Sequence, residues 1–288
     1  MNVSLTNATR KLCVIGDPVL HSKSPLIQNT MIAALGLDYI YLCQPVERGR
    51  AADWLACARL SGYAGFNATM PHKEALAALV DRLDEDAALY GAVNTVVLRD
   101  GEALGCNTDG RGFLRALAGL GVAPAGRRVL LLGAGGAAKA VALKLAQQGA
   151  ERVYVCNRTP EKAEALCRQD PTGRLRPAGF APEELRRLAG ECALAVNCTS
   201  LGMTGTGGRF ADLSFLEALP PEAAVCDLIY SPAETELLRR ARAGGHPAMN
   251  GLPMLVWQAV YALELFTDTR IDGDAMMELL RRTVFQGE

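Results

Sequence analysis

A glycine-rich stretch, Gly133–Ala138, has the spacing that a phosphate-binding turn requires. It directly follows the apolar segment 128–132 and leads into the helical pattern 139–148, so it fits the strand–turn–helix fingerprint G-x-G-x-x-(G/A). Gly133 permits the tight turn, and Gly135 lets the backbone approach a pyrophosphate at the helix N-terminus. This pattern predicts dinucleotide binding, with a purely structural tight turn as the alternative. The predicted cofactor-binding residues of this turn are Gly133, Ala134, Gly135, Gly136 and Ala137.

The segment after the next predicted strand indicates which dinucleotide binds. NAD-selective sites usually carry an acidic residue there, which hydrogen-bonds the ribose hydroxyl. This chain instead has Asn157, Arg158 and Thr159. An acidic side chain would repel a 2′-phosphate, whereas an arginine with flanking amide and hydroxyl groups would hold it. We therefore expect NADP, with a solvated loop arginine and a Thr159 helix cap as the alternative reading.

Alternating strand and helix patterns must position these residues. In the first part of the chain, strands are expected at 12–15, 39–43 and 63–68, with a hairpin formed by 94–99 and 102–106 around Asp100-Gly101. Helices are expected from an N-cap at Ser24, over 50–60, from Pro71, and from Asp109 to about 120. After a boundary near 121–126, apolar strands ending near Leu132, Val155, Ala195 and Val225 alternate with helices, a doubly wound α/β pattern. Two helices are expected after Leu252.

Composition excludes several classes of protein. The 288 residues are 50% hydrophobic and 21% charged with a net charge of −1, which is typical of a packed globular protein and not of a nucleic-acid platform. The longest apolar run, 129–138, is too short to cross a bilayer, and no signal peptide is recognised. Nine scattered cysteines without a Cys-x-x-Cys pair indicate reduced thiols in the cytoplasm, and three histidines give no metal-ligand spacing.

The polar segments of the chain, taken together, resemble shikimate dehydrogenases over nearly the whole length. The motifs that carry the resemblance are Ser22-x-Ser24-Pro, Gly65-Phe-Asn-x-Thr-x-Pro-x-Lys73, Gly91-Ala-Val-Asn94-Thr, Asn107-Thr-Asp109-Gly, Gly133 to Ala138, Asn157-Arg-Thr, Asn197-x-Thr-Ser-x-Gly-Met203, Asp227-x-x-Tyr230-x-Pro-x-x-Thr235 and Met254-Leu-x-x-Gln258. The resemblance implies NADPH-dependent reduction of 3-dehydroshikimate to shikimate, on the route to chorismate and aromatic amino acids.

The resemblance also implies a two-domain α/β fold with the active site in the cleft between the domains. The N-terminal substrate-binding domain would comprise residues 1–109, joined by the C-terminal helices 252–288. A Rossmann-type NADP-binding domain would comprise residues 110–251. The expected partner is the small-molecule substrate, with neither nucleic acid nor membrane, and the expected assembly is a monomer or homodimer.

The resemblance assigns roles residue by residue. Lys73 and Asp109 would be the catalytic pair, since hydride reduction of a ketone needs a proton donor beside the developing alkoxide. Without the motifs, a surface helix lysine would be the favoured interpretation of Lys73, and a helix N-cap that of Asp109. The residues expected to bind substrate are Ser22, Ser24, Thr69, Lys73, Asn94, Asp109, Tyr230 and Gln258. Further residues expected to bind the cofactor are Thr199, Met203, Leu228 and Gly251.

Three positions depart from the family pattern. Gln28 stands where a histidine is usual, Ala68 replaces a common valine, and Pro253 replaces a frequent glycine. None removes a catalytic group, but Pro253 removes a backbone N–H near the expected nicotinamide side. His21 and His72 flank the site, and we interpret them as neighbouring polar residues and not as the proton donor.

Three other interpretations remain open. A quinate/shikimate dehydrogenase, or a relative acting on aminoshikimate, would need room near Ser22, Ser24 and Tyr230. An NAD-dependent quinate enzyme would be expected to carry an acid where this chain has Asn157 and Arg158. A non-catalytic protein that binds shikimate and regulates transcription or another enzyme is the alternative from another class, against which the chain retains Lys73 and Asp109. The third alternative is a purely structural α/β subunit, and the polar residues at the strand ends count against it.

Overall fold

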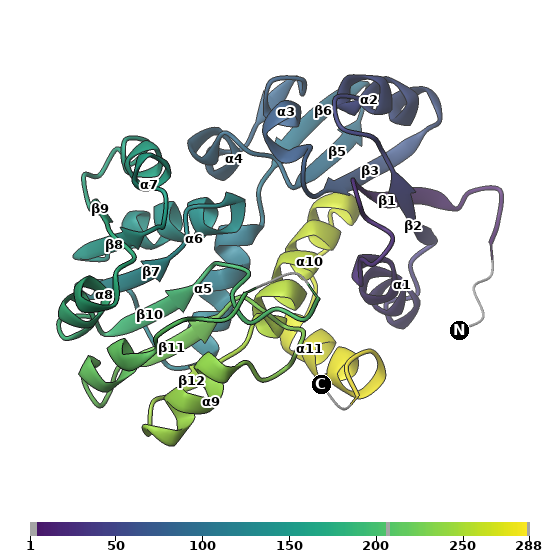
Figure 1. The fold of residues 1–288 in the computed structure, drawn as a ribbon. Coiled ribbons are helices and arrows are strands. Elements are labelled where there is room, and N and C mark those ends of the chain that lie inside the picture. Colours follow the sequence, from purple (N-terminus) through teal and green to yellow (C-terminus); the bar gives the residue numbers. More distant parts are fainter. Residues whose placement is uncertain (1–4, 206–207, 287–288) are drawn as a thin grey trace. The chain divides into compact units, whose positions relative to one another are not determined.

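The computed structural model describes residues 5–205 and 208–286, and the chain forms two compact units. Unit 1 comprises Met1–Thr108 and Val256–Gly287, and unit 2 comprises Asp109–Leu255. Each unit is built around its own six-stranded sheet (Figure 1).

The sheet of unit 1 has the strand order β2-β1-β3-β5-β6-β4. Strand β1 pairs in parallel with β2 and β3, while β3, β5 and β6 form antiparallel pairs. The β5–β6 hairpin turns at Asp100 and Gly101, whose positive φ angles of 51° and 82° suit a two-residue hairpin turn. Its strands are β1 (Arg10–Gly16), β2 (Tyr39–Pro45), β3 (Tyr63–Ala68), β4 (Arg82–Leu83), β5 (Thr95–Arg99) and β6 (Glu102–Cys106).

The helices of unit 1 come from both the N-terminal and the C-terminal parts of the sequence. They are α1 (Ser24–Ala34), α2 (Ala51–Leu60), α3 (Lys73–Ala77), α4 (Glu85–Tyr90), α10 (Leu252–Thr267) and α11 (Gly273–Thr283). The C-terminal helix α10 packs closely on the sheet, since a Cβ built on Gly65 of β3 would lie 2.6 Å from the Phe266 ring. Gln28 of α1 donates a 3.0 Å hydrogen bond to the Ala259 carbonyl of α10. The two expected C-terminal helices are confirmed.

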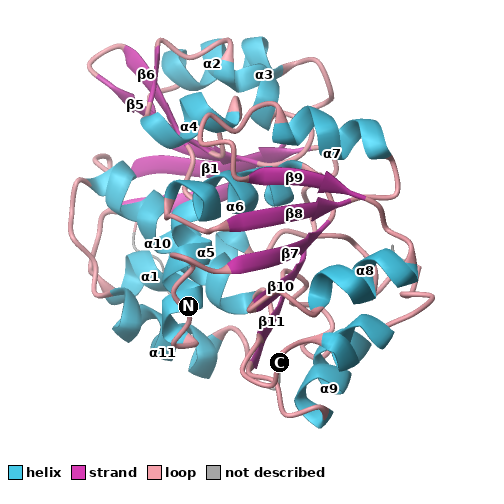
Figure 2. Ribbon diagram, turned by 90° about the vertical axis from the view of Figure 1, so that its left-hand side faces the viewer, coloured by secondary structure: helices cyan, strands magenta, loops and turns pink. Residues whose placement is uncertain are grey.

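The sheet of unit 2 is entirely parallel. Its order is β12-β11-β10-β7-β8-β9, so the chain starts in the middle, runs to one edge, and then crosses over to build the other half (Figure 2). This is the strand order of a Rossmann fold, with the reversal between β7 and β10. The strands are β7 (Arg128–Leu132), β8 (Arg152–Cys156), β9 (Leu175–Ala178), β10 (Leu194–Asn197), β11 (Ala224–Asp227) and β12 (Ala248–Met249).

Helices cover the sheet of unit 2. They are α5 (Asp109–Gly119), α6 (Gly136–Gln147), α7 (Pro160–Cys167), α8 (Pro182–Ala189), the 3₁₀ helix η1 (Ser214–Ala218) and α9 (Glu236–Ala243). Alternate strand residues such as Leu130 and Leu132 pack with Leu188 of α8, Phe215 of η1 and Leu237 of α9 in one buried cluster. Because side chains alternate along a strand, the intervening residues face the other side of the sheet. The expected doubly wound α/β fold is confirmed.

Two expected helix starts are wrong in detail. Helix α1 was expected to have Ser24 as its N-cap, but Lys23 holds that position and Ser24 is the first helical residue. Lys23 adopts helical angles (φ −79°, ψ −7°), and the Ser22 hydroxyl accepts a 3.2 Å hydrogen bond from the Ser24 amide instead. Helix α3 starts at Lys73 and not at Pro71.

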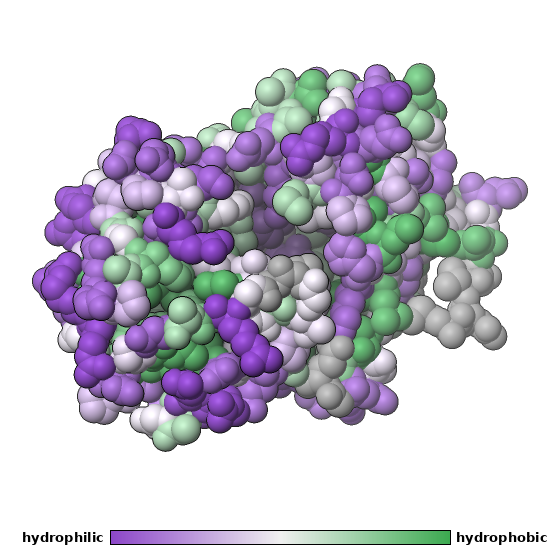
Figure 3. Space-filling model, in the orientation of Figure 1, coloured by the Kyte–Doolittle hydropathy of each residue, from purple (hydrophilic) through white to green (hydrophobic). Residues whose placement is uncertain are grey.

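The surface, the helices and the cysteines can be compared with the expectations drawn from composition. Hydrophilic residues are spread over the visible parts of both units (Figure 3). Among the described residues, no helix is both long enough and apolar enough to span a bilayer. All nine cysteines are free thiols.

Candidate active site

The glycine-rich turn after β7 has the conformation that its sequence predicts. Gly133 has φ +109°, a region that side chains disfavour, and a Cβ there would lie 3.1 Å from Thr199 Cγ2. A Cβ added to Gly135 or Gly136 would meet only open space, so the backbone at the start of α6 is uncovered. Ala138 is fully buried against the fold. The turn therefore presents free space at a helix N-terminus, as phosphate binding requires.

Backbone hydrogen bonds tie this turn to both neighbouring strands. The Gly133 amide donates to the Cys156 carbonyl at the end of β8 (2.7 Å). The Cys198 amide, just after β10, donates to the Leu132 carbonyl (2.8 Å). The carboxyl ends of β7, β8 and β10 thus meet where the strand order reverses, the position at which open α/β sheets bind ligands.

The segment after β8 contains the three residues predicted to select NADP. Arg158 is exposed, and no hydrogen bond or ion pair engages it among the described residues. The Asn157 side chain donates to the Thr159 carbonyl (2.9 Å), which holds the loop in shape. Thr159 is the N-cap of α7, but its side chain makes no capping hydrogen bond. The helix-capping role considered for its hydroxyl is therefore not seen.

The residues expected beside the nicotinamide follow β10, β11 and β12 at the same edge. Thr199 and Met203 belong to the loop after β10, and Leu228 follows β11, with its amide donating to the Asn197 carbonyl (2.9 Å). The Gly251 amide donates to the Ile229 carbonyl (3.0 Å). A Cβ on Gly251 would collide with the Leu228 carbonyl group, so only glycine permits this close approach.

A buried polar cluster lies behind these loops, and its members belong to the motifs although none was predicted as a site residue. Asn197 and Asp227 are opposite each other at the ends of β10 and β11, and are 1% and 0% exposed. The Asn197 Nδ2 donates to Asp227 Oδ1 (3.0 Å), and Thr235 donates to Asp227 Oδ2 (2.6 Å). The signal in the sequence was a polar residue closing each of two apolar strands, Leu194–Asn197 and Ala224–Asp227.

In unit 1, three predicted residues are brought together at one edge of the sheet. Thr69 follows β3, and its amide donates to the Ile15 carbonyl of β1 (2.9 Å). Lys73 is the first residue of α3, and its carbonyl accepts the Val93 amide (2.8 Å). Asn94 precedes β5 and is 3% exposed. A lysine at a helix N-terminus is disfavoured by the helix dipole, which argues for a role other than helix stability.

Hydrogen bonds from a second set of buried residues fix Asn94. Its Oδ1 accepts from the Thr95 hydroxyl (2.8 Å) and the Thr108 amide (3.0 Å), and its Nδ2 donates to Thr108 Oγ1 (3.0 Å). Asn67 donates to the Asn94 carbonyl (3.1 Å) and accepts from the Tyr41 hydroxyl (2.7 Å). Asn67, Thr95, Thr108 and Tyr41 were not predicted as site residues, although Asn67, Thr95 and Thr108 lie in the motifs.

The remaining substrate residues of unit 1 lie on or beside α1 and α10. Ser22 and Ser24 are half-buried, and the Ser24 hydroxyl has no hydrogen bond among the described residues. Gln258 is half-buried on α10, next to the Ala259 carbonyl that Gln28 holds. The departure at Gln28 therefore serves helix packing, with its side chain 1% exposed.

Two predicted substrate residues belong to unit 2. Asp109 is the first residue of α5 and is 7% exposed. Tyr230 is half-buried in the segment between β11 and α9.

Pro253 is the second residue of α10, a position where the backbone N–H has no helical partner, so the proline costs no helix hydrogen bond.

Of the two histidines that flank the motifs, only His72 has a visible structural role. His72 is 1% exposed, and its Nε2 lies 2.8 Å from the Val46 carbonyl, whereas His21 is exposed. No cluster of His, Cys, Asp or Glu in the described part of the chain is arranged to hold a metal ion. Burial raises the pKa of Cys192 and of Cys226, each to about 12, which keeps these thiols protonated and unreactive.

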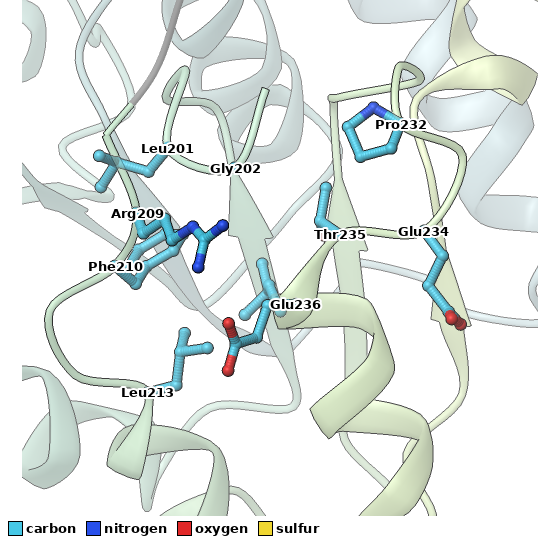
Figure 4. Close-up of a pocket in the computed structure, with 10 residues that line it drawn as sticks. Leu201, Gly202, Arg209, Phe210, Leu213, Pro232, Glu234, Thr235 and Glu236 are labelled. Atoms are coloured by element: carbon cyan, nitrogen blue, oxygen red, sulfur yellow. The ribbon is translucent and has the colours of Figure 1, made fainter. Parts of the chain in front are cut away.

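Unit 2 contains a pocket of about 240 Å³ beside the loop after β10 (Figure 4). It is bounded by Leu201 and Gly202 of the loop after β10, by Arg209 and Phe210, and by the segment 232–237. None of the predicted cofactor or substrate residues lines it. The pocket is therefore distinct from the phosphate-binding turn.

Known proteins share this architecture and these motifs. The shikimate dehydrogenase (NADP(+)) of Geobacter metallireducens is 43% identical to this chain over 92% of its length and 93% of the relative's. The chain belongs to the shikimate dehydrogenase family. Family models agree: residues 14–96 match the shikimate dehydrogenase substrate binding domain, 119–200 match shikimate / quinate 5-dehydrogenase, and 251–281 match the shikimate 5'-dehydrogenase C-terminal domain.

Two solved structures show which ligands such dehydrogenases bind. Shikimate 5-dehydrogenase from Thermus thermophilus, in complex with NADP(H) and shikimate, is 38% identical with a TM-score of 0.82 over 95% of this chain and 99% of that one. Quinate dehydrogenase from Corynebacterium glutamicum, in complex with NAD, is 30% identical with a TM-score of 0.86 over 95% and 99%. The fold therefore occurs in shikimate and quinate dehydrogenases and with NADP(H) or NAD bound, so side chains must select the substrate and the cofactor.

Proposed function

We propose that this protein catalyses the reversible NADP-dependent reduction of 3-dehydroshikimate to shikimate, a step toward chorismate and the aromatic amino acids. The observation that carries the proposal is the identity to an NADP-dependent shikimate dehydrogenase over nearly the whole chain. The loop after β8 adds support, because it offers an unpaired exposed Arg158 where an NAD-selective site has an acid.

The residues present fit NADP. Uncovered backbone at Gly135 and Gly136 leaves room for the pyrophosphate at the N-terminus of α6. Arg158, with Asn157 and Thr159, would bind the 2′-phosphate by charge-assisted hydrogen bonds. Thr199, Met203, Leu228 and Gly251 would border the nicotinamide, and the turn residues Gly133, Ala134 and Ala137 would complete the site.

We assign the proton transfer to Lys73, with Asp109 as its partner. NADP held in this site would supply the hydride chemistry at the carbon that bears the reacting hydroxyl, in either direction. Lys73 takes the hydroxyl proton as shikimate is oxidised and gives it back as 3-dehydroshikimate is reduced, so no free alkoxide forms. Asp109 accepts a hydrogen bond from a ring hydroxyl and holds the lysine ammonium in place.

The remaining polar residues would bind the substrate in its reactive orientation. Ser22 and Ser24 would donate hydroxyl hydrogen bonds to the carboxylate, with Tyr230 at the same end. Thr69, Asn94 and Gln258 would contact the ring hydroxyls. Asn94 suits this task because its buried partners fix its position, and a preformed site loses little entropy on binding.

Initial rates with shikimate and quinate, each with NADP and NAD, test the proposal. We expect shikimate with NADP to be the fastest pair. Faster turnover of quinate with NAD would favour the quinate dehydrogenase alternative, for which the Corynebacterium enzyme is the structural precedent. Binding of shikimate without turnover in any of the four combinations would favour a regulatory protein.

A double-mutant cycle tests the assignment of Lys73 and Asp109. If the two act as one unit, Lys73→Ala and Asp109→Ala each remove most of the activity, and the double variant is little worse than either single one. Losses that multiply would mean that the two residues act independently.

The setting of the enzyme is part of the proposal. We expect it in the cytoplasm, because nine free cysteines suit a reducing compartment. A monomer or homodimer, without nucleic-acid or membrane partners, stays a prediction, and light scattering of the purified protein at several concentrations measures the assembly.

A further inference from the structure

Asp227 is an acidic side chain that is fully buried and that the reaction does not use. It closes strand β11, its side chain is 0% exposed, and it lies in register with Asn197 at the end of β10. Burying a carboxylate is costly unless each oxygen has hydrogen-bond partners. The identity of those partners therefore indicates what the residue does.

Both oxygens of Asp227 accept hydrogen bonds from residues that lie at the end of β10 or after β11. Oδ1 accepts from Asn197 Nδ2 (3.0 Å) and from the Ile229 amide (3.1 Å). Oδ2 accepts from the Thr235 hydroxyl (2.6 Å), and that hydroxyl accepts the Leu238 amide (3.4 Å) at the start of α9. One carboxylate thus joins the end of β10, the segment after β11 and the N-terminus of α9.

Asn197 extends the same network to Thr199. The Asn197 Oδ1 accepts from the Thr199 amide (3.0 Å) and the Thr199 hydroxyl (2.7 Å). The Thr199 hydroxyl in turn accepts the Leu201 amide (3.1 Å). Through these bonds, the conformation of the loop that carries Thr199 and Met203 depends on the position of the Asp227 carboxylate.

The two loops also meet directly. The Thr204 amide, in the loop after β10, donates a hydrogen bond to the Ser231 carbonyl in the segment after β11 (3.2 Å). The pocket of Figure 4 is lined by Leu201 and Gly202 of one loop and by Pro232 and Thr235 of the other. The polar network of Asp227 therefore acts beside one backbone hydrogen bond in fixing the spacing of the loops.

Burial makes the charged form of Asp227 costly to the fold. Burial raises the pKa of Asp227, although its hydrogen bonds from Thr235, Ile229 and Asn197 oppose the rise. An acid whose pKa is raised in the folded state penalises folding at every pH above its ordinary pKa, and the penalty is relieved as the pH falls. The fold therefore carries this carboxylate at a cost in stability at neutral pH.

We propose that Asp227 is a positioning residue for the nicotinamide side of the cofactor site. It sets the distance between the loop of Thr199 and Met203 and the segment of Leu228 and Tyr230. It has no part in binding the adenosine end, which the glycine-rich turn and Arg158 hold. The inference rests on the proposed function for the identity of the cofactor.

The test is Asp227→Asn, which keeps the shape but places an amide nitrogen where a carboxylate oxygen accepted hydrogen bonds. We expect kcat to fall about 10- to 100-fold, the scale of a misplacement of roughly 1 Å at a reacting centre. Affinity for NADP should fall about tenfold, the scale of one lost hydrogen bond to a charged group. Affinity for adenosine 2′,5′-bisphosphate, which lacks the nicotinamide, should stay within about twofold. Calorimetric titration of the full-length protein measures both affinities.

Asp170→Asn is the matched control in the same unit. Its carboxylate accepts four hydrogen bonds, from Thr172, Arg174 and Leu175, compared with three at Asp227, but it shapes a loop at the start of β9, away from the carboxyl ends of the strands. Hydrogen bonding lowers the pKa of Asp170 despite the opposing effect of burial, so this carboxylate stabilises the fold above its ordinary pKa and loses that effect at lower pH. At neutral pH, Asp170→Asn should lower the melting temperature and leave kcat unchanged, whereas Asp227→Asn should lower kcat with a smaller loss of melting temperature.

Two results would overturn the inference. One is an Asp227→Asn protein whose kcat and NADP affinity stay within twofold of the wild type. The other is an equal loss of affinity for NADP and for the bisphosphate, which marks a general structural role. If Asp227→Asn does not fold, Thr235→Val is the substitute variant, because it removes the hydrogen bond to Asp227 Oδ2. It is judged by the same comparison, the loss of affinity for NADP against the loss of affinity for the bisphosphate. Absence of wild-type turnover with shikimate would count against the proposed function alone, because the affinity ratio needs no turnover.

Discussion

The selectivity for NADP over NAD is expected to depend on Arg158. This arginine is exposed after β8 and has no acidic partner among the described residues, so its charge is available to a phosphate. A charge-assisted hydrogen bond of this kind contributes roughly 10- to 100-fold in affinity, and solvent exposure places Arg158 in the lower part of that range. We therefore expect Arg158→Ala to weaken NADP binding about 10- to 30-fold.

NAD affinity provides the internal comparison, because NAD lacks the 2′-phosphate. It should change by less than about twofold in Arg158→Ala, since no charge-assisted contact is lost. Arg152→Ala is the matched control: it removes the same charge from the other end of β8, about 20 Å away for six residues of extended chain. That distance is about twice the Debye length at physiological salt, so Arg152→Ala should leave both affinities unchanged.

Fluorescence or calorimetric titration of both dinucleotides, for the wild type and the two variants, completes the assay. Equal weakening of NADP and NAD in Arg158→Ala would mean that the arginine only shapes its loop. A loss of NADP affinity in Arg152→Ala as large as that in Arg158→Ala would mean that long-range charge, and not a contact, selects the cofactor.

Three further outcomes are expected. Lys73→Ala should lower kcat at least about 10²-fold without loss of folded structure, and a loss under tenfold would remove Lys73 from proton transfer. Gly133→Ala should lower the free energy of unfolding, measured in urea, by about 1–2 kcal/mol, because an alanine at φ +109° is strained. Gly135→Ala should not lower it, since Gly135 has φ −86° and open space around it. Equal stability of the two variants would refute the backbone strain assigned to an alanine at position 133. Thiol-specific reagent should modify the exposed Cys57 first and the buried Cys192, whose pKa is about 12, only on unfolding, and early loss of Cys192 would contradict its burial.

Local signals in the sequence predicted most of the fold. The hairpin at Asp100-Gly101 was predictable because two consecutive residues with positive φ favour such a pair. The strand over 63–68 and the glycine-rich turn were predictable because strand, turn and helix patterns follow one another without a gap. The N-cap of α1 was not, because Ser24 before a proline fits a cap equally well as a first helical residue.

Contacts between residues distant in sequence could not be predicted in the same way. Gln28 reaches the Ala259 carbonyl 231 residues later, and no local pattern announces that partner. The Asn197–Asp227 pair depends on β10 and β11 being neighbours in register, which appears only in the folded sheet. Such buried polar pairs fix the loops that carry site residues, and their identity follows from tertiary structure.

The most direct test of the central claim is the stoichiometry of the reaction with 3-dehydroshikimate and NADPH. The account predicts that the purified protein oxidises one NADPH for each 3-dehydroshikimate consumed, with shikimate as the product identified by chromatography and mass spectrometry. Absence of NADPH oxidation, or oxidation that yields a different product, would contradict it.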